Sequence, residues 1–246
     1  MDLARTPSSG LAAEVLPPSL HAAVTHVFSH GVEGAMLAGG TALAGYYAGH
    51  RRSDDLDVFA GSALAYRAAV LSVKSLREIG CSLADERSSA RFYHATCRLR
   101  GHGFTVQVVL DSNLFAVGVG IKADDGVVVA DLDTLLKMKA ATLVSRASEK
   151  DLFDLSWFFA QAGQLDVPTL IALGQQIDGG VNAEAVLVNL VGTPMRESAC
   201  GFSVTKNPAE VFAEVARVRK GLIQGVERHL RSGTAPPIAR LLRKLT

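Results

Sequence analysis

The sequence predicts an α+β fold in which a mixed N-terminal half precedes an all-helical C-terminal half. Before residue 131, short apolar or alternating runs that are typical of strands are interleaved with helical patterns. From Leu132 onwards the pattern is helical almost to the end. The composition, 48% hydrophobic and 20% charged over 246 residues, is that of a globular protein with a sizeable core. We therefore expect one domain over residues 18–130 and a helical domain over 131–246.

The elements of the N-terminal half follow from local patterns. Prolines at 17–18 open a helix that ends at His30, just before a glycine. Residues 35–38 are a short apolar run, which predicts a buried strand, and residues 55–59 alternate polar and apolar side chains as a half-buried strand does. The other expected elements are helices over 41–48 and 62–79 and strands over 90–99, 104–110 and 127–130.

Charge and cysteine content exclude several classes of protein. The formal net charge is +1, so no global field points to nucleic acid or a membrane. The three cysteines are far apart and form no C-x-x-C pair, which argues against a disulfide framework and a zinc knuckle. The chain has neither a leader-like start nor an apolar run long enough for a bilayer, so we expect a cytoplasmic protein without a membrane partner.

The most informative stretch is a glycine pair followed by an Asp-x-Asp strand. Gly39 and Gly40 allow the close approach of a triphosphate to bare backbone, and Thr41 offers a hydroxyl to the phosphates or to the next helix. Asp55 and Asp57 are two apart on a strand, so both side chains point to the same face. Such a pair of hard oxygen ligands suits Mg²⁺ in two-metal phosphate chemistry. A lone glycine pair is most often a turn and a lone Asp-x-Asp a solvated edge, but their ordered combination favours nucleotide transfer.

The sequence GGTAL at 39–43, followed by RRSDDLDVF at 51–59, resembles the AbiEii/AbiGii toxin family of nucleotidyltransferases, which belong to the DNA polymerase β superfamily. The similarity covers about residues 30–160. It implies a polymerase-β-like core, a small mixed sheet with flanking helices. It also implies a metal-dependent enzyme, with Mg²⁺ or Mn²⁺, that transfers a nucleotide from an NTP and releases pyrophosphate. An RNA or tRNA acceptor and a cognate antitoxin protein are the partners that this resemblance implies.

The same family carries a lysine on a helix in its second half, then an arginine and a Lys-Asp stretch. Lys139, Arg146 and Asp151 match these positions. Seven residues on one helix would place Lys139 and Arg146 on the same face, where both could neutralise the β- and γ-phosphates. Asp151 would orient Lys139 or contact the nucleotide.

A purely local interpretation of this segment exists. Ser148 and Asp151 have the spacing of a capping box. Lys150 and Asp154 have the spacing of a surface ion pair. The agreement with the family favours a catalytic role for Lys139 and Asp151 over this interpretation.

The superfamily adds a third carboxylate on a later strand, which binds the metal and accepts a proton. Gln107 stands in the middle of the corresponding strand and Asp111 at its end, on the same face by alternation. We take Asp111 as the candidate for both roles, because a glutamine is a neutral ligand and cannot act as a base. If neither residue serves, a catalytically inactive NTP- or RNA-binding protein is the alternative.

The sequence is compatible with two classes of acceptor. The stretch from Arg217 to the C-terminus is rich in lysine and arginine, which suits contact with an RNA backbone. A small-molecule transferase of the aminoglycoside type is the other enzymatic alternative, and it would present an acidic pocket. His26 and His30 are four apart on a helix, a spacing compatible with a metal pair, but without an H-E-x-x-H context we expect surface histidines.

Overall fold

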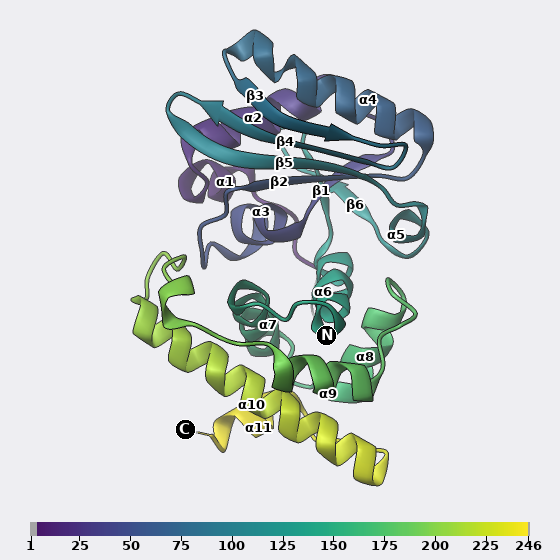
Figure 1. Cartoon of the computed structure of the whole chain (residues 1–246), viewed down its shortest axis with the longest axis vertical. Coiled ribbons are helices and arrows are strands. Elements are labelled where there is room, and N and C mark those ends of the chain that lie inside the picture. Colours follow the sequence, from purple (N-terminus) through teal and green to yellow (C-terminus); the bar gives the residue numbers. More distant parts are fainter. Residues whose placement is uncertain (1–3, 246) are drawn as a thin grey trace. The chain divides into compact units, whose positions relative to one another are not determined.

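The computed structural model describes residues 4–245, which fall into two units (Figure 1). One unit is Arg5–Thr134, and the other is residues 135–245 together with Ala4. Every strand of the described residues lies in the first unit, whereas the second is helical. The predicted α+β class is therefore confirmed.

The first unit is built on a seven-stranded mixed sheet with the order β3-β4-β5-β2-β1-β7-β6. The pairs β2–β5 and β1–β7 are parallel, and the other neighbours are antiparallel. The strands are β1 (Ala35–Ala38), β2 (Asp55–Ala60), β3 (Ser82–Ser88), β4 (Phe92–Leu99), β5 (His102–Leu110), β6 (Gly120–Lys122) and β7 (Val128–Ala130).

The sequence patterns predict neither edge strand of this sheet. β3 is almost entirely exposed and β6 has only three residues, so neither carries the apolar alternation by which a strand is found. The five inner strands match the predicted positions to within a few residues. Edge strands of polar character are a common protection against pairing with other chains.

Helices cover the sheet on both sides in Figure 1, with α4 on one face and α3 on the other. Ser62 caps α4 by accepting a hydrogen bond from the Ala65 amide, and Pro18 occupies the first turn of α2. The helical elements of this unit are α1 (Ser9–Val15), α2 (Pro18–Ser29), α3 (Gly39–Leu43), the π-helical turn η1 (Ala44–Ala48), α4 (Ala63–Lys74), the 3₁₀ turn η2 (Ser75–Ile79) and α5 (Ser112–Val117).

The two faces of β2 differ, and this difference positions the candidate site. Leu56, Val58 and Ala60 are fully buried in the core. Asp55 and Asp57 alternate with them on a half-exposed face. Since side chains alternate along a strand, burial of the apolar set turns both carboxylates to the opposite side of the sheet.

The second unit is organised around its longest helix, α10 (Pro208–Ser232). Its buried residues, from Val211 to Val226, recur every three or four positions and pack against α7, α9 and α11. The other helical elements are α6 (Leu132–Ala141, whose first turn belongs to the first unit), η3 (Thr142–Val144), α7 (Glu149–Gln161), α8 (Val167–Gln175), α9 (Ala183–Gly192), η4 (Glu197–Ala199) and α11 (Ile238–Arg243).

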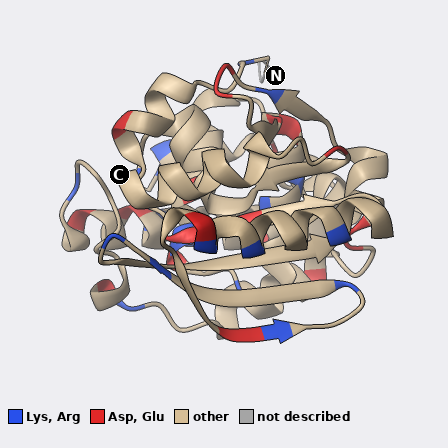
Figure 2. Cartoon of the chain, turned by 90° about the horizontal axis from the view of Figure 1, so that it is seen from above, with Lys and Arg blue, Asp and Glu red and all other residues tan. Residues whose placement is uncertain are grey.

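Two surface properties bear on function. Lysine and arginine are interspersed with aspartate and glutamate over much of the chain, in keeping with the net charge near zero (Figure 2). Within the described residues, no helix combines the length and the apolarity needed to cross a bilayer.

Candidate active site

Asp55 and Asp57 share the half-exposed face of β2, as the sequence predicts. The parallel register of β2 and β5 sets Thr105 opposite Asp55. The Thr105 hydroxyl donates a hydrogen bond of 2.6 Å to Oδ1 of Asp55. This contact fixes the orientation of one carboxylate of the pair.

The glycine pair lies directly against this strand. Ala38, the last residue of β1, pairs with Asp57, and Gly39 follows with a φ of +68°. A Cβ at Gly39 would overlap the Asp57 carboxylate. A Cβ at Gly40 would lie 2.5 Å from Nη2 of Arg51. Only residues without side chains allow Asp57 and Arg51 to approach the backbone here.

The side chains of Arg51 and Ser53 lie against Gly40. Both side chains are almost fully buried, at 2% and 1% exposure. Nη1 of Arg51 donates to the Arg52 carbonyl at 3.0 Å. The Ser53 hydroxyl has no hydrogen-bond partner among the described residues and lies 3.2 Å from where a Gly40 Cβ would stand. Because buried polar atoms are nearly always satisfied, this hydroxyl is suited to an added ligand with acceptor oxygens.

The structure gives Thr41 a different role from the two that its sequence position suggests. Its side chain is fully buried, and its hydroxyl donates to the backbone carbonyl of Asp55. The N-cap of α3 is Ala38, and no side chain caps that helix. Thr41 therefore attaches α3 to β2, and its hydroxyl is directed neither to solvent nor to the helix end.

The position beside Asp57 on β5 is Gln107, not Asp111. Gln107 pairs with Asp57 in the parallel register. Asp111 comes after the end of β5, where it caps α5 by accepting a hydrogen bond of 3.0 Å from the Leu114 amide. Four residues of strand separate Asp111 from Gln107 by about 13 Å. Within the part of the chain that the structure describes, no third carboxylate, histidine or cysteine forms a compact ligand group with Asp55 and Asp57.

Sequence reasoning missed His94. In the antiparallel β4–β5 pair His94 is opposite Gln107, so Asp57, Gln107 and His94 form one row across three strands. His94 is half-buried, and its Nδ1 has no hydrogen-bond partner among the described residues. The signal for this placement is the two-residue turn between Leu99 and His102, which sets the hairpin register.

A second cluster of predicted residues lies within the helical unit and centres on Asp151. This side chain is 1% exposed and completes a capping box with Ser148. It also accepts hydrogen bonds from Lys139 at 2.9 Å and from Nε of Arg146 at 2.9 Å. Burial raises the pKa of Asp151, but the charges of Lys139 and Arg146 outweigh burial, so that its pKa lies below the ordinary value. Asp151 thus caps α7 and at the same time pairs with two cations, so the capping box that the sequence indicates is present.

One expectation about this segment, and one part of the local interpretation, are wrong. Lys139 and Arg146 do not share a helix face, because α6 ends at Ala141 and Arg146 lies in the turn before α7. Asp154 forms no surface pair with Lys150, because it is fully buried and contacts Nζ of Lys139 at 2.7 Å. Lys139 is therefore enclosed between two carboxylates, whereas the Arg146 side chain remains 64% exposed.

No family model matches this chain, and no curated protein sequence matches it. Two solved structures to which it is similar are MenT4, a nucleotidyltransferase toxin from Mycobacterium tuberculosis H37Rv, and JHP933 from Helicobacter pylori. The MenT4 alignment has a TM-score of 0.54 and 17% identity, and covers 98% of this chain and 99% of MenT4. The JHP933 alignment has a TM-score of 0.49 and 17% identity, and covers 90% of this chain and 95% of that one.

The chain has a nucleotidyltransferase fold. The MenT4 similarity extends over nearly the whole length of both chains, so it includes both the sheet unit and the helical unit. Within this nucleotidyltransferase fold, the Asp-x-Asp strand and the glycine turn come together in the sheet unit, and the Lys139–Asp151 cluster lies in the helical unit. At this level of identity the similarity shows the fold alone, and activity has to be argued from the residues.

Proposed function

We propose that this chain is a metal-dependent nucleotidyltransferase that moves a nucleotide from an NTP to an acceptor and releases pyrophosphate. The observation that carries the proposal is the juxtaposition of Asp55 and Asp57, on one face of β2, with the bare backbone of Gly39 and Gly40. The resemblance of the two motifs to the AbiEii/AbiGii toxins and the MenT4-like fold support it.

Asp55 and Asp57 are the residues that would hold the divalent cation. Their oxygens fit Mg²⁺ or Mn²⁺, which prefer hard ligands and take a few carboxylates together with substrate phosphates. When bound, such a cation neutralises phosphate charge and activates an attacking hydroxyl. Gln107 adds at most a neutral amide oxygen beside this pair.

The residues suited to the phosphates are those around Gly40. The buried Arg51 guanidinium supplies positive charge against the glycine backbone, and the Ser53 hydroxyl supplies a donor that has no partner among the described residues. Of the two cations bonded to Asp151, Arg146 is the exposed one, and the resemblance to the toxin family is the ground for proposing it as a phosphate ligand; Asp151 holds its guanidinium in place. Lys139 would act by fixing Asp151 and thereby Arg146, since two carboxylates already neutralise its charge.

The proton of the attacking hydroxyl needs an acceptor. Gln107 cannot take a proton, and Asp111 is occupied as the cap of α5. His94 is the next side chain in the row that starts at Asp57, and a neutral imidazole is a suitable general base. We assign this role to His94 as part of the proposed mechanism.

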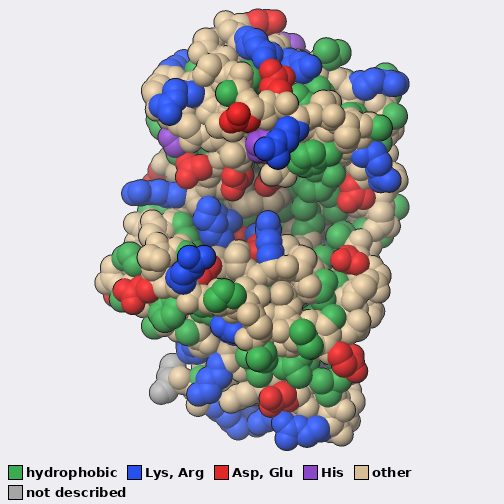
Figure 3. All heavy atoms as spheres, viewed as in Figure 1, with side chains coloured by type: hydrophobic (Ala, Val, Ile, Leu, Met, Phe, Trp, Pro, Cys, Tyr) green, Lys and Arg blue, Asp and Glu red, His purple; other side chains and the backbone are tan. Residues whose placement is uncertain are grey.

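The surface of α10 favours RNA as the acceptor over a cationic drug. A groove of about 520 Å³ is lined by Arg219 and Lys220 beside apolar side chains, and an adjoining groove of about 380 Å³ contains Arg228 and Arg231. Part of this charge is used internally: Arg219 donates to carbonyls at the end of α9, and Arg231 pairs at 3.1 Å with Glu227, which lines both grooves. Lysine and arginine side chains nevertheless gather over α10 and α11 (Figure 3), as contact with an RNA backbone requires.

We further propose that the acceptor is tRNA and that the protein is a toxin of the AbiEii type with a cognate antitoxin. MenT4 is itself described as a nucleotidyltransferase toxin, which supports this finer assignment. The neutral Gln107 keeps one alternative open, an inactive NTP- or RNA-binding protein.

The test incubates the purified chain with total tRNA, Mg²⁺ and each α-labelled NTP in turn, with an aminoglycoside in place of tRNA as a parallel arm. We expect label in tRNA, and we expect it to be lost in Asp57→Asn. Asp54→Asn is the matched control, because Asp54 is an exposed neighbouring carboxylate that pairs with His102 at 3.2 Å.

The outcomes separate the alternatives. Transfer that survives in Asp57→Asn contradicts the proposed site. Label on the aminoglycoside alone contradicts RNA as acceptor, and NTP binding without transfer to either acceptor identifies an inactive binder.

A further inference from the structure

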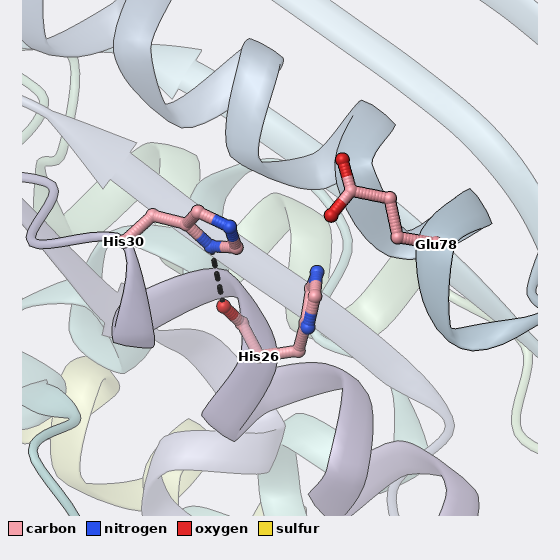
Figure 4. A group of neighbouring side chains, drawn as sticks. All are labelled: His26, His30 and Glu78. Carbon is pink, nitrogen blue, oxygen red and sulfur yellow. Dashed lines mark hydrogen bonds between the residues drawn. The ribbon is translucent and has the colours of Figure 1, made fainter.

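A second group of metal-ligating side chains lies in the sheet unit, on residues outside the candidate active site. His26 and His30 project from the C-terminal end of α2, and Glu78 comes from η2. One ligand atom from each residue lies within 4.8 Å of the others. Figure 4 shows the two rings and the carboxylate directed into the same space. Among the described residues this is the one such group of three.

The hydrogen bond of His30 directs its Nε2 lone pair toward a prospective metal ion. Its Nδ1 donates to the backbone carbonyl of His26 at 2.9 Å, the bond drawn in Figure 4. In a neutral imidazole this leaves the lone pair on Nε2. Histidines that bind metals commonly donate their second ring nitrogen to a backbone carbonyl in this way, which fixes both tautomer and orientation.

His26 needs one adjustment. Its Nε2 lies 3.2 Å from the Ser75 carbonyl and 3.0 Å from the Ser75 hydroxyl, so in the metal-free state Nε2 carries the proton. Binding through Nε2 requires this proton to move to Nδ1 and the hydrogen bond to Ser75 to be given up. The hydroxyl of Ser75 keeps its bond to the Ser72 carbonyl, at 2.8 Å, whether or not His26 contacts it.

The carboxylate of Glu78 has no hydrogen bond or ion pair among the described residues, although two cations are close in sequence. Arg77 is bonded to Glu86. Lys74 lies over the Tyr93 ring, with Nζ 5.7 Å from its centroid. Both neighbouring positive charges are therefore directed elsewhere, and the charge of Glu78 is left beside the two histidines.

We propose that His26, His30 and Glu78 bind a zinc ion at a site separate from the carboxylate pair of β2. Two imidazoles and one carboxylate are the ligand set of open zinc sites, in which water completes the tetrahedron. Nitrogen ligands select borderline transition ions over Mg²⁺, so this site and the Asp55–Asp57 pair take different metals. The exposure of His30 and Glu78 gives the completing water access.

Zinc at this position would join the end of α2 to η2. Three residues before η2, the Ser72 hydroxyl of α4 already joins this part of the chain to α2, because it donates to the Val27 carbonyl at 2.5 Å. Because the ligands come from segments about 50 residues apart, the ion would stabilise the folded sheet unit, by an amount that rises with the logarithm of its concentration over its dissociation constant. This inference does not depend on the proposed nucleotidyl transfer.

Calorimetric titration of the full chain with ZnCl₂, and separately with MgCl₂, tests the proposal. We expect 1:1 zinc binding that excess MgCl₂ does not displace, and an apparent melting temperature that rises with ZnCl₂. His30→Asn, His26→Asn and Glu78→Gln should each weaken zinc binding by at least about tenfold. Glu33→Gln and His229→Asn, which change the same residue types outside the group, should leave it unchanged.

Two further readouts make the test decisive. Co²⁺ should give visible absorption of tetrahedral type in the wild type and lose it in the His26→Asn/His30→Asn double variant. A melting curve without metal checks that each variant is folded. Equal zinc affinity in the wild type and the folded double variant overturns the proposal, and so does zinc binding that is lost only in Asp55→Asn.

Discussion

Gln107 of β5 pairs with Asp57 of β2 in the parallel register, so an amide stands beside the acidic pair where a third carboxylate would be expected. The nearest candidate from the sequence, Asp111, is four residues further on and caps α5. The proposed metal site therefore has two carboxylates, and the proposed proton acceptor is a histidine one strand further across the sheet.

A carboxylate at position 107 should strengthen metal binding. We expect Gln107→Asp to tighten Mn²⁺ binding by about tenfold, equivalent to about 1.4 kcal/mol, since a hard anionic oxygen would join Asp55 and Asp57. Mn²⁺ titration followed by electron paramagnetic resonance measures this. Asp111→Ala is the comparison, because it should leave Mn²⁺ affinity unchanged and lower the free energy of unfolding by about 1 kcal/mol through loss of the cap. A loss of Mn²⁺ binding in Asp111→Ala would restore Asp111 as a ligand.

Replacement of His94 should affect the chemical step and not substrate binding. If His94 accepts the proton, His94→Gln should lower kcat by about 10²- to 10⁴-fold with KM for NTP nearly unchanged. Steady-state kinetics with NTP as the varied substrate measures both constants. His102→Gln is the control, because His102 pairs with the exposed Asp54 instead of facing Gln107. An unchanged kcat in His94→Gln would remove His94 from the mechanism.

Gly39→Ala should abolish activity because its methyl group would displace the Asp57 carboxylate, an effect that can be separated from backbone strain. Gly39→Ala would place a Cβ on the Asp57 carboxylate and also force an L-residue to a φ of +68°. Gly31→Ala imposes similar strain, at a φ of +63°, with nothing within 4 Å of the new Cβ. Both variants should lose about 1–3 kcal/mol of stability, but only Gly39→Ala should lose Mn²⁺ binding and label transfer. Equal activity of the two variants would contradict the close packing at Gly39.

The Asp151 cluster should make the free energy of unfolding depend on pH in the acidic range. Because the pKa of Asp151 in the folded chain is below its ordinary value of 3.8, its stabilising contribution is complete above that value and is lost as the pH falls further. Asp151→Asn should abolish this fall in the free energy of unfolding at low pH. It should also destabilise the chain at pH 7 by about 3 kcal/mol, which is the lower end for a broken buried ion pair, because Asp154 still neutralises Lys139. Urea unfolding between pH 2.5 and 7 measures both.

Arg146→Ala serves as the partner experiment to Asp151→Asn. Its exposed guanidinium should contribute less than about 1 kcal/mol to stability. Label transfer, however, should fall and KM for NTP should rise if Arg146 contacts phosphate. A variant with wild-type KM would assign Arg146 to structure alone.

Local sequence patterns account for the α+β class, the inner strands and the alternation of β2. They also predict that Asp55 and Asp57 share a face and that a glycine pair adjoins them, because a period of two and a missing Cβ are local properties of the chain. The capping box of Ser148 and Asp151 is equally local. Each of these features depends on residues no more than a few positions apart, or on the order of the glycine pair and the Asp-x-Asp motif along the chain.

The tertiary structure decided the features that depend on register and burial. The parallel β2–β5 register, and not the position of an acidic residue in the sequence, placed Gln107 beside Asp57 and brought His94 into the same row. Burial of the Thr41 side chain directed its hydroxyl to the backbone carbonyl of Asp55, and burial of Lys139 enclosed its ammonium group between two carboxylates. Such contacts join residues far apart in the chain, and their energies depend on desolvation and close packing, which no periodicity in the sequence encodes.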